Sequence, residues 1–120
     1  MGKFEQTETN LVIGQDAKLV RDKIPEIIRA EGRDPKVEVL DDAGYERALC
    51  AKVLEEATEF SEAVNDAHVL EEAADIVEVL RARLKLRGLS LDDVEQVRVR
   101  KNEQRGGFAE RLFMYTVSGE

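Results

Sequence analysis

The stretch EEATEFSEAVNDAHVLEEAAD, residues 55–75, decides the fold, because its polar and apolar residues recur with helical period on both sides of a short break. The first half ends a long helix predicted over residues 42–65. The second half begins another long helix, predicted over residues 67–87 and closed by Gly88 at the position of a C-terminal cap. So short a break between two long helices predicts an antiparallel pair.

Shorter helices are predicted on either side of this pair. One begins near Arg21 and ends near Gly32, with Pro25 in its first turn. Another follows Ser90, whose side chain can act as an N-cap, and reaches about residue 104. We therefore expect an all-α fold, a helical bundle of two long antiparallel helices with shorter helices beside them.

The remaining segments have weaker patterns. Val37 and Val39 alternate with charged residues and indicate a brief extended piece. The tail over residues 108–117 is apolar-rich and is either a strand or irregular. Phe108 either packs on a base or fills the core, and we favour the core. We interpret residues 18–117 as a single domain and residues 1–17 as an N-terminal extension.

Composition limits the classes of protein that fit. With 120 residues, of which 42% are hydrophobic and 37% charged, the chain resembles one globular domain rather than a disordered segment. Cys50 is the sole cysteine, which excludes an internal disulfide and a cysteine-based zinc cluster. A net charge of −8 disfavours binding to long nucleic acid, and no apolar run is long enough to span a membrane. We expect a cytoplasmic protein.

Charge is distributed unevenly along the chain. Residues 41–79 hold twelve acidic and two basic side chains, whereas residues 80–111 hold five acidic and nine basic ones. Residues 18–36 hold four acidic and six basic side chains. An acidic centre between basic flanks suits a cation site with phosphate-binding groups nearby. A solvated charged helix face explains the same pattern equally well at this point.

Two acids of the first long helix lie on its apolar side. At about 100° per residue, Glu56 falls within the apolar stripe and Glu59 lies one turn further on at its edge. Glu55 and Lys52 stand close to this edge. The stripe itself comprises Tyr45, Leu49, Val53, Phe60, Ala63 and Val64.

The second long helix repeats the arrangement. Glu72 points among the residues that widen its apolar stripe, and Asp75 stands one turn further on at the border. A helix of a small bundle turns its main apolar stripe to the core. The main stripe comprises Leu70, Ala73, Val77, Leu80 and Leu84, and the widening side comprises Val69, Ile76 and Val79.

These inward-facing acids are unusual, because burying an unpaired carboxylate costs on the order of several kcal/mol. Glu56 with Glu59, and Glu72 with Asp75, are both i, i+3 pairs, so the carboxylates of each pair lie about 5–6 Å apart on one face. If the two helices pack together, the four carboxylates converge. Hard oxygen ligands of this kind suit Mg²⁺, with Mn²⁺ as a substitute, better than zinc or copper.

A solvated surface and a di-iron centre are the alternatives to a magnesium site. Either acidic cluster alone favours a solvated surface with salt bridges inside the helix, and only the combination favours a metal. A di-iron carboxylate bundle requires Glu-x-x-His pairs. The single histidine, His68, has Asn65 three residues before it, which excludes that site and makes His68 a surface or helix N-terminal residue.

The motif E-E-x-x-E, twelve residues, then E-x-x-D over residues 55–75 resembles the signature of the all-α nucleotide pyrophosphohydrolase superfamily. That superfamily includes MazG, dimeric dUTPases and phosphoribosyl-ATP pyrophosphohydrolases. The segments KLVRDKIPEII, residues 18–28, and KNEQRGGF, residues 101–108, resemble a short MazG-like, house-cleaning subgroup predicted to clear non-standard nucleoside triphosphates. The resemblance covers about residues 18–113, and the lead-in before Lys18 is longer than this subgroup's pattern.

The resemblance implies a MazG-like bundle that completes its core and site as a homo-oligomer, a dimer or a tetramer. It also implies Mg²⁺-dependent hydrolysis of a small nucleotide, in which a nucleoside triphosphate gives a nucleoside monophosphate and pyrophosphate. Among the implied ligands, Glu55 lies at the more open edge and is our candidate for activating the attacking water. Carried over residue by residue, the metal site comprises Glu55, Glu56, Glu59, Glu72 and Asp75.

Basic residues of the flanks are our candidates for binding phosphate. Salt bridges to the surplus acids are the competing interpretation, and this is strongest for Lys52, four residues before Glu56. The glycines after Arg105 either let the backbone approach a ligand or simply end a helix. The candidates are Arg21, Lys23, Lys52, Lys101 and Arg105.

Two further functions stay open. One is the phosphoribosyl-ATP pyrophosphohydrolase of histidine biosynthesis, and the KLVRDKIP opening favours nucleotide clearance over it. The second is a catalytically silent helical module that binds nucleotides or regulates a partner. The presence of all five acids favours an enzyme over this module.

Overall fold

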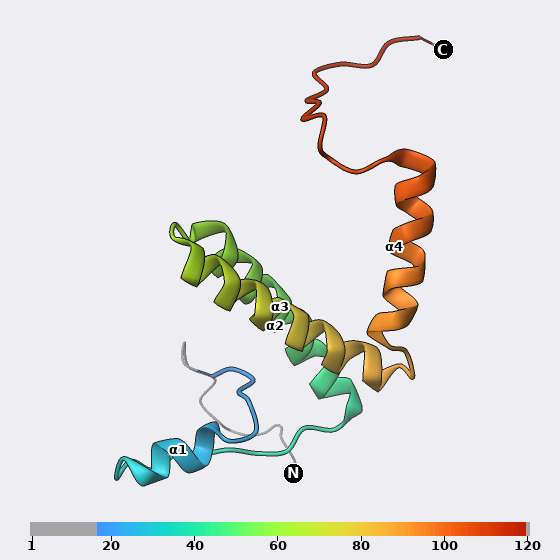
Figure 1. Cartoon of the computed structure of the whole chain (residues 1–120). Helices are drawn as coiled ribbons and strands as arrows, with labels where there is room; N and C mark the ends of the chain where they lie inside the picture. The colour runs from blue at the N-terminus through green and yellow to red at the C-terminus, as the bar shows by residue number, and fades with distance from the viewer. Residues whose placement is uncertain (1–16, 120) are drawn as a thin grey trace.

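The computed structural model describes residues 17–119, and this part of the chain contains helices and no strand. The helices are α1 (Ile24–Ala30), α2 (Asp42–Glu62), α3 (Asp66–Leu86) and α4 (Leu91–Arg105). Helices α2 and α3 lie side by side and antiparallel, and together they form the α2–α3 hairpin (Figure 1). The all-α prediction is confirmed. The extension predicted over residues 1–17 lies, but for its last residue, outside the described residues.

Polar N-caps explain where the long helices begin. The side chain of Asp41 accepts a hydrogen bond from a backbone N–H in the first turn of α2, at 2.8 Å. Asn65 accepts one at 2.9 Å from the N–H of His68, which is exposed in the first turn of α3 as predicted. Ser90 and Asp93 form a reciprocal capping box at the start of α4. The cap predicted at Ser90 is therefore confirmed.

The first helix and the segments without regular structure differ from the predictions. Helix α1 begins at Ile24 rather than near Arg21, because Pro25 in its first turn has no N–H to donate to the carbonyl of Arg21. The piece around Val37 and Val39 is irregular, since the described residues offer no neighbouring strand to pair with it. The tail over residues 108–117 is also irregular.

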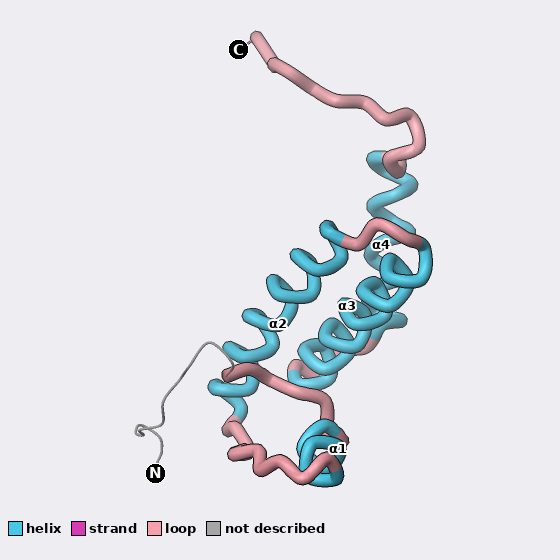
Figure 2. The backbone as a smooth tube through the Cα atoms, turned by 90° about the vertical axis from the view of Figure 1, so that its left-hand side faces the viewer, coloured by secondary structure: helices cyan, strands magenta, loops and turns pink. Residues whose placement is uncertain are grey.

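The hydrophobic core of the described chain is small. Leu49 and Val79 are its only buried hydrophobic residues, and Glu56 is buried between the same two helices with 5% of its surface exposed. The view in Figure 2 follows the two helices along their shared length to the short loop that joins them. A core this small indicates that a single chain covers only one side of each long helix.

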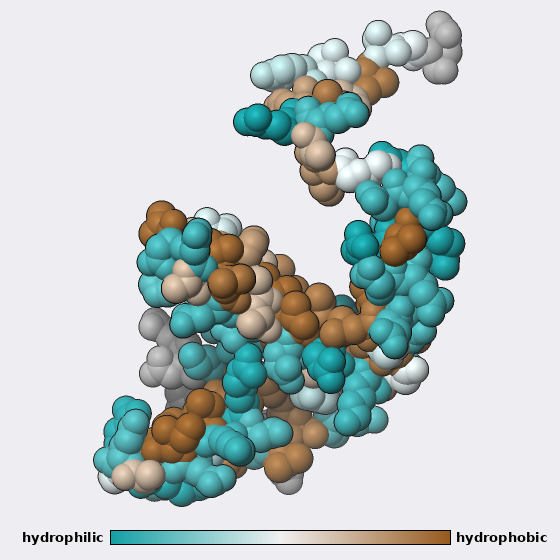
Figure 3. Space-filling view, viewed as in Figure 1, coloured by the Kyte–Doolittle hydropathy of each residue, from teal (hydrophilic) through white to brown (hydrophobic). Residues whose placement is uncertain are grey.

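Two predictions about burial are wrong for the single chain. Helix α3 turns its widening side, with Val79, toward α2, so that most of the stripe predicted as the main one is exposed, while Ala73 and Leu84 are half-buried. Of that stripe, Leu70 is 70% exposed, and Val77 and Leu80 are exposed as well. Phe108 is 97% exposed rather than part of the core. Apolar residues accordingly show along the hairpin and in the C-terminal tail in Figure 3.

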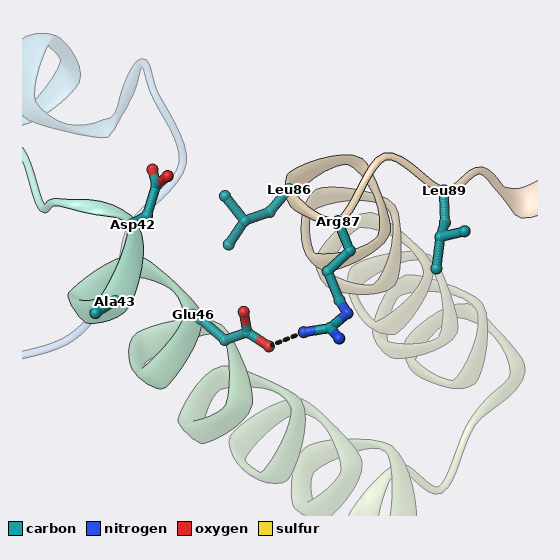
Figure 4. A pocket seen from close by; sticks show the side chains of 6 residues that line it. All are labelled: Asp42, Ala43, Glu46, Leu86, Arg87 and Leu89. Atoms are coloured by element: carbon teal, nitrogen blue, oxygen red, sulfur yellow. Dashed lines mark hydrogen bonds and ion pairs between the residues drawn. The ribbon is translucent and has the colours of Figure 1, made fainter.

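An open pocket of about 500 Å³ lies where α2 begins and α3 ends. Figure 4 shows Glu46 pointing toward Arg87 across its mouth, at 3.2 Å, while Arg83 also pairs with Glu46 at 3.0 Å. These pairs join residues distant in sequence and fix the antiparallel register of the two helices. Within the described residues, no helix is long and apolar enough to cross a membrane.

Candidate metal centre between α2 and α3

The predicted acids converge in the middle of the α2–α3 hairpin. Glu56 lies on α2 and Glu72 and Asp75 lie on α3, and one carboxylate oxygen from each falls within 4.8 Å of those of the other two. A second set on α2, formed by Glu55, Glu56 and Glu59, meets the same limit and shares Glu56 with the first. Because Glu56 belongs to both sets, the structure brings all five acids together around this one buried residue.

Two carboxylate oxygens of this cluster are buried without a hydrogen-bond partner. They are Oε1 of Glu56 and Oε1 of Glu72. Glu56 is buried as a whole, whereas Glu72 and Asp75 are half-buried and Glu59 is exposed. Buried polar groups in folded proteins are nearly always paired, so two unpaired acceptors facing one interface point to a missing positive charge or donor.

The crowding of negative charge changes the acidity of Glu72. Its pKa is raised above the ordinary 4.5, first because the side chain is removed from water and then because Glu59, Asp75 and Glu56 surround it with like charge. A bound cation would favour the ionised carboxylate and act against this shift. The electrostatics of the cluster thus agree with its unpaired oxygens.

Lys52 partly compensates the charge on α2. Its Nζ lies 3.3 Å from Oε2 of Glu55 and 3.5 Å from Oε2 of Glu56, with 17% of the lysine side chain exposed. The salt bridge from Lys52 to Glu56, which competes with phosphate binding by this lysine, is therefore present. It lies at Oε2 of Glu56 and leaves Oε1 without a hydrogen-bond partner.

Arg21 compensates the charge on α3. Its guanidinium donates a hydrogen bond of 2.6 Å to Oδ1 of Asp75, across a separation of 54 residues in sequence. The sequence pattern placed Arg21 among the phosphate-binding candidates but gave no sign of this partner. The segment before α1 is thus tied to the acidic cluster by one partly exposed ion pair.

The other basic candidates lie apart from the acids. Lys23 caps α1 through its backbone position, and Lys101 and Arg105 lie in the second half of α4. None of the three forms an ion pair with another described residue, 17–119. Because α4 touches α3 only weakly and then leads away from the hairpin, it carries its two cations away from the acids of its own chain (Figure 1).

Residues 36–102 match the sequence profile of the phosphoribosyl-ATP pyrophosphohydrolase family. The chain belongs to this family. The matched region contains the whole α2–α3 hairpin and most of α4, and hence every acid of the cluster. The description of this family names a pyrophosphohydrolase.

A relative in Mycolicibacterium smegmatis (strain ATCC 700084 / mc(2)155), named only as an uncharacterized protein, is 56% identical over 43 residues. The match spans 36% of this chain and 44% of the relative, so less than half of the relative is covered. No solved structure matches the chain. The family assignment consequently rests on the profile match across the hairpin.

The donor set fits a divalent cation. Five carboxylates face two ammonium or guanidinium groups, Lys52 and Arg21, which leaves the cluster negatively charged when all its members are ionised. Carboxylate oxygens are the ligands that Mg²⁺ and Mn²⁺ accept, and Mg²⁺ also keeps waters that can complete its shell. Such an ion would supply the missing partner of the two unpaired oxygens.

Proposed function

We propose that the chain is an Mg²⁺-dependent nucleoside triphosphate pyrophosphohydrolase that releases a nucleoside monophosphate and pyrophosphate. The observation that carries the proposal is the pair of unpaired oxygens, Oε1 of Glu56 and Oε1 of Glu72, on opposite sides of one helix interface. The family match supports pyrophosphohydrolysis, and the converging acids support a metal to perform it. Glu56, Glu72 and Asp75 would hold the ion, with Glu55 and Glu59 beside them on α2.

When bound, Mg²⁺ would polarise phosphate oxygens and lower the pKa of a water. The residues of the chain supply position and charge, which is most of what phosphoryl transfer requires. Glu55 is half-buried at the open edge of the cluster, where its carboxylate can accept a proton from a water approaching the α-phosphate. Lys52, whose Nζ lies 3.3 Å from Oε2 of Glu55, holds that carboxylate in place.

Arg21 is the cation best placed to exchange partners. Its side chain is 58% exposed and its only ion pair among the described residues is with Asp75. If Asp75 held a metal, the guanidinium of Arg21 would be free to bind a substrate phosphate in the bidentate manner that suits arginine. Lys23, two residues further on, is a second candidate for the same phosphates.

The hydrolysis of phosphoribosyl-ATP is the second candidate reaction, and the family description supports it directly. The KLVRDKIP segment before α1 favours the clearance of non-standard nucleoside triphosphates. Both reactions cleave a pyrophosphate bond next to the α-phosphate and would use the same acids. A catalytically silent module is the third candidate, and the complete set of acids argues against it.

One experiment separates these candidates. The purified chain is incubated with Mg²⁺ and, in separate reactions, with phosphoribosyl-ATP, dUTP, dCTP and oxidised purine triphosphates, and pyrophosphate release is measured. We expect the highest kcat/KM with one of the triphosphates. Highest activity with phosphoribosyl-ATP would favour the histidine pathway reaction. Nucleotide binding without any release would favour the silent module.

A further inference from the structure

The basic arm, defined here as residues 17–30, comprises α1 and the described residues before it. No residue of α1 is buried, and α1 contacts none of the other helices within residues 17–119. In Figures 1 and 2 this helix stands apart from the α2–α3 hairpin. Packing of α1 against the hairpin therefore does not fix the position of the arm.

The connection from the basic arm to α2 is long and exposed. It covers residues 31–41, contains no helix or strand, and is exposed at every position except Pro35, which is half-buried. Such a segment can change its backbone angles without losing buried contacts. The arm can therefore move while the hairpin keeps its own structure.

One ion pair ties the basic arm to the hairpin. Arg21 donates a hydrogen bond of 2.6 Å to Oδ1 of Asp75, and no other ion pair joins the arm to the hairpin within the described residues. The two side chains are 58% and 35% exposed. Because water and salt weaken a pair that is this exposed, Arg21 can exchange Asp75 for another partner.

Charge indicates what holds the basic arm and what releases it. The arm carries four basic and two acidic side chains, and the cluster on the hairpin carries five carboxylates with Lys52 beside them. A divalent cation held by Asp75 would supply the positive charge that Arg21 now supplies, and would repel the guanidinium. A polyphosphate bound to that cation would bring negative charge back to the same place.

We propose that the basic arm is a strap with two alternative partners: Arg21 holds it on Asp75 in the metal-free chain, and on the phosphates of a nucleotide in the loaded chain. The arm leaves Asp75 when this carboxylate binds a divalent cation, and it returns when phosphates follow. Lys23 is exposed, forms no ion pair among the described residues, and adds a second cation for the phosphates. The inference rests on the metal site and the phosphate-bearing substrate of the proposed function.

The test measures the distance between two spin labels by pulsed electron paramagnetic resonance. The native thiol is removed by Cys50→Ser, and labels are attached at two exposed positions, through Ala30→Cys on the arm and Glu78→Cys on the hairpin. An excess of unlabelled chain keeps each measured distance within one chain. We expect a narrow distribution in EDTA, a broader and longer one in Mg²⁺, and a narrow one again in Mg²⁺ with inorganic triphosphate.

A matched pair of variants identifies the contact that holds the arm. In Arg21→Ala the distribution should be broad under all three conditions, because the ion pair with Asp75 and the phosphate ligand are both lost. Arg33→Ala removes an exposed pair with Glu31 instead, and its distributions should follow those of the unmodified residues. A narrow distribution for Arg21→Ala in EDTA would overturn the proposal.

Titration calorimetry with Mg²⁺ and a pyrophosphate assay separate failure of the strap from failure of the proposed function. Mg²⁺ binding and pyrophosphate release without a change in the label distance would overturn the strap and leave the proposed function standing. A distance that changes with Mg²⁺ and triphosphate, in a chain that releases pyrophosphate from no nucleotide, would support the strap and reject the proposed function. No binding of Mg²⁺ would overturn both.

Discussion

Glu56 and Glu72 come from different helices, and each directs one oxygen without a hydrogen-bond partner into the interface between them. Neither acid has an arginine or lysine on that oxygen, because Lys52 contacts the other oxygen of Glu56 and Arg21 contacts Asp75. In the absence of a cation, this relationship opposes the packing of α2 on α3. A divalent ion bound between the two carboxylates would replace this repulsion by attraction to the ion.

Replacing Glu56 by glutamine should lower pyrophosphate release roughly 100-fold or more, because it removes the acid shared by both candidate ligand sets. The metal-free variant should melt about 4 °C higher, corresponding to about 1 kcal/mol, since a buried charge is lost and the amide can donate to Glu72. Activity assays and thermal melts in EDTA measure the two effects. Glu62→Gln, on the exposed end of α2, is the control. Normal turnover by Glu56→Gln would show that Glu56 is not a ligand.

The raised pKa of Glu72 should make the free energy of unfolding depend on pH. Because its pKa is raised above 4.5 in the folded chain, the folded state keeps this proton to a higher pH than the unfolded state does. Metal-free wild type should therefore lose stability relative to Glu72→Gln as the pH rises above 4.5. Thermal melts between pH 4 and 8 with EDTA, against the exposed Glu71→Gln, measure the difference. A constant difference between wild type and Glu72→Gln across this range would contradict the crowding of charge.

Removing Arg21 should have opposite effects on metal and substrate. In Arg21→Ala, Asp75 loses its ion pair, and the affinity for Mg²⁺ alone should rise by up to about 5-fold, since an exposed pair contributes about 1 kcal/mol at most. The KM for the nucleotide should rise, because a phosphate ligand is lost. Titration calorimetry and initial rates measure the two constants. Arg33→Ala removes an exposed pair with Glu31 instead and should change neither. A fall in Mg²⁺ affinity for Arg21→Ala would contradict the exchange of partners.

Ser90→Ala should loosen α4 while sparing the hairpin. The capping box satisfies the first turn of α4, and its loss costs about 1 kcal/mol, so the amides of residues 91–105 should exchange with deuterium about 5-fold faster. Ser61→Ala is the matched control, since the Ser61 hydroxyl donates to the carbonyl of Thr58 inside α2 and caps no helix start. Equal exchange of α4 in both variants would show that packing, rather than the cap, fixes this helix.

Periodicity predicted the parts of the structure that depend on neighbouring residues. It placed Glu56 on the buried side of α2 and set Glu72 among the apolar residues that face it, because both are properties of one helix. The caps at Gly88 and Ser90 were likewise visible, since they depend on a few adjacent residues. The all-α fold follows from the same local signals.

Contacts between segments distant in sequence could not be predicted from these local patterns. Arg21 and Asp75 pair across 54 residues, and nothing in either segment identifies the other. The two apolar sides of α3 overlap on a helical wheel, so the sequence could not say that Val79 would face α2 while Leu70 would stay exposed. The direction of α4 is similarly set outside the helix, by the turn around Gly88.

Three residues, 63–65, separate α2 from α3, so the acids meet through the shortest connection between helices in residues 17–119. Contacts between residues close in sequence require little loop-closure entropy, which favours rapid folding. Formation of the hairpin brings like charges together, so dissolved salt should accelerate folding by screening them. Refolding rates should increase with sodium chloride in the unmodified chain and depend less on it in Glu56→Gln. The salt dependence of the refolding rate therefore measures the repulsion between the clustered carboxylates.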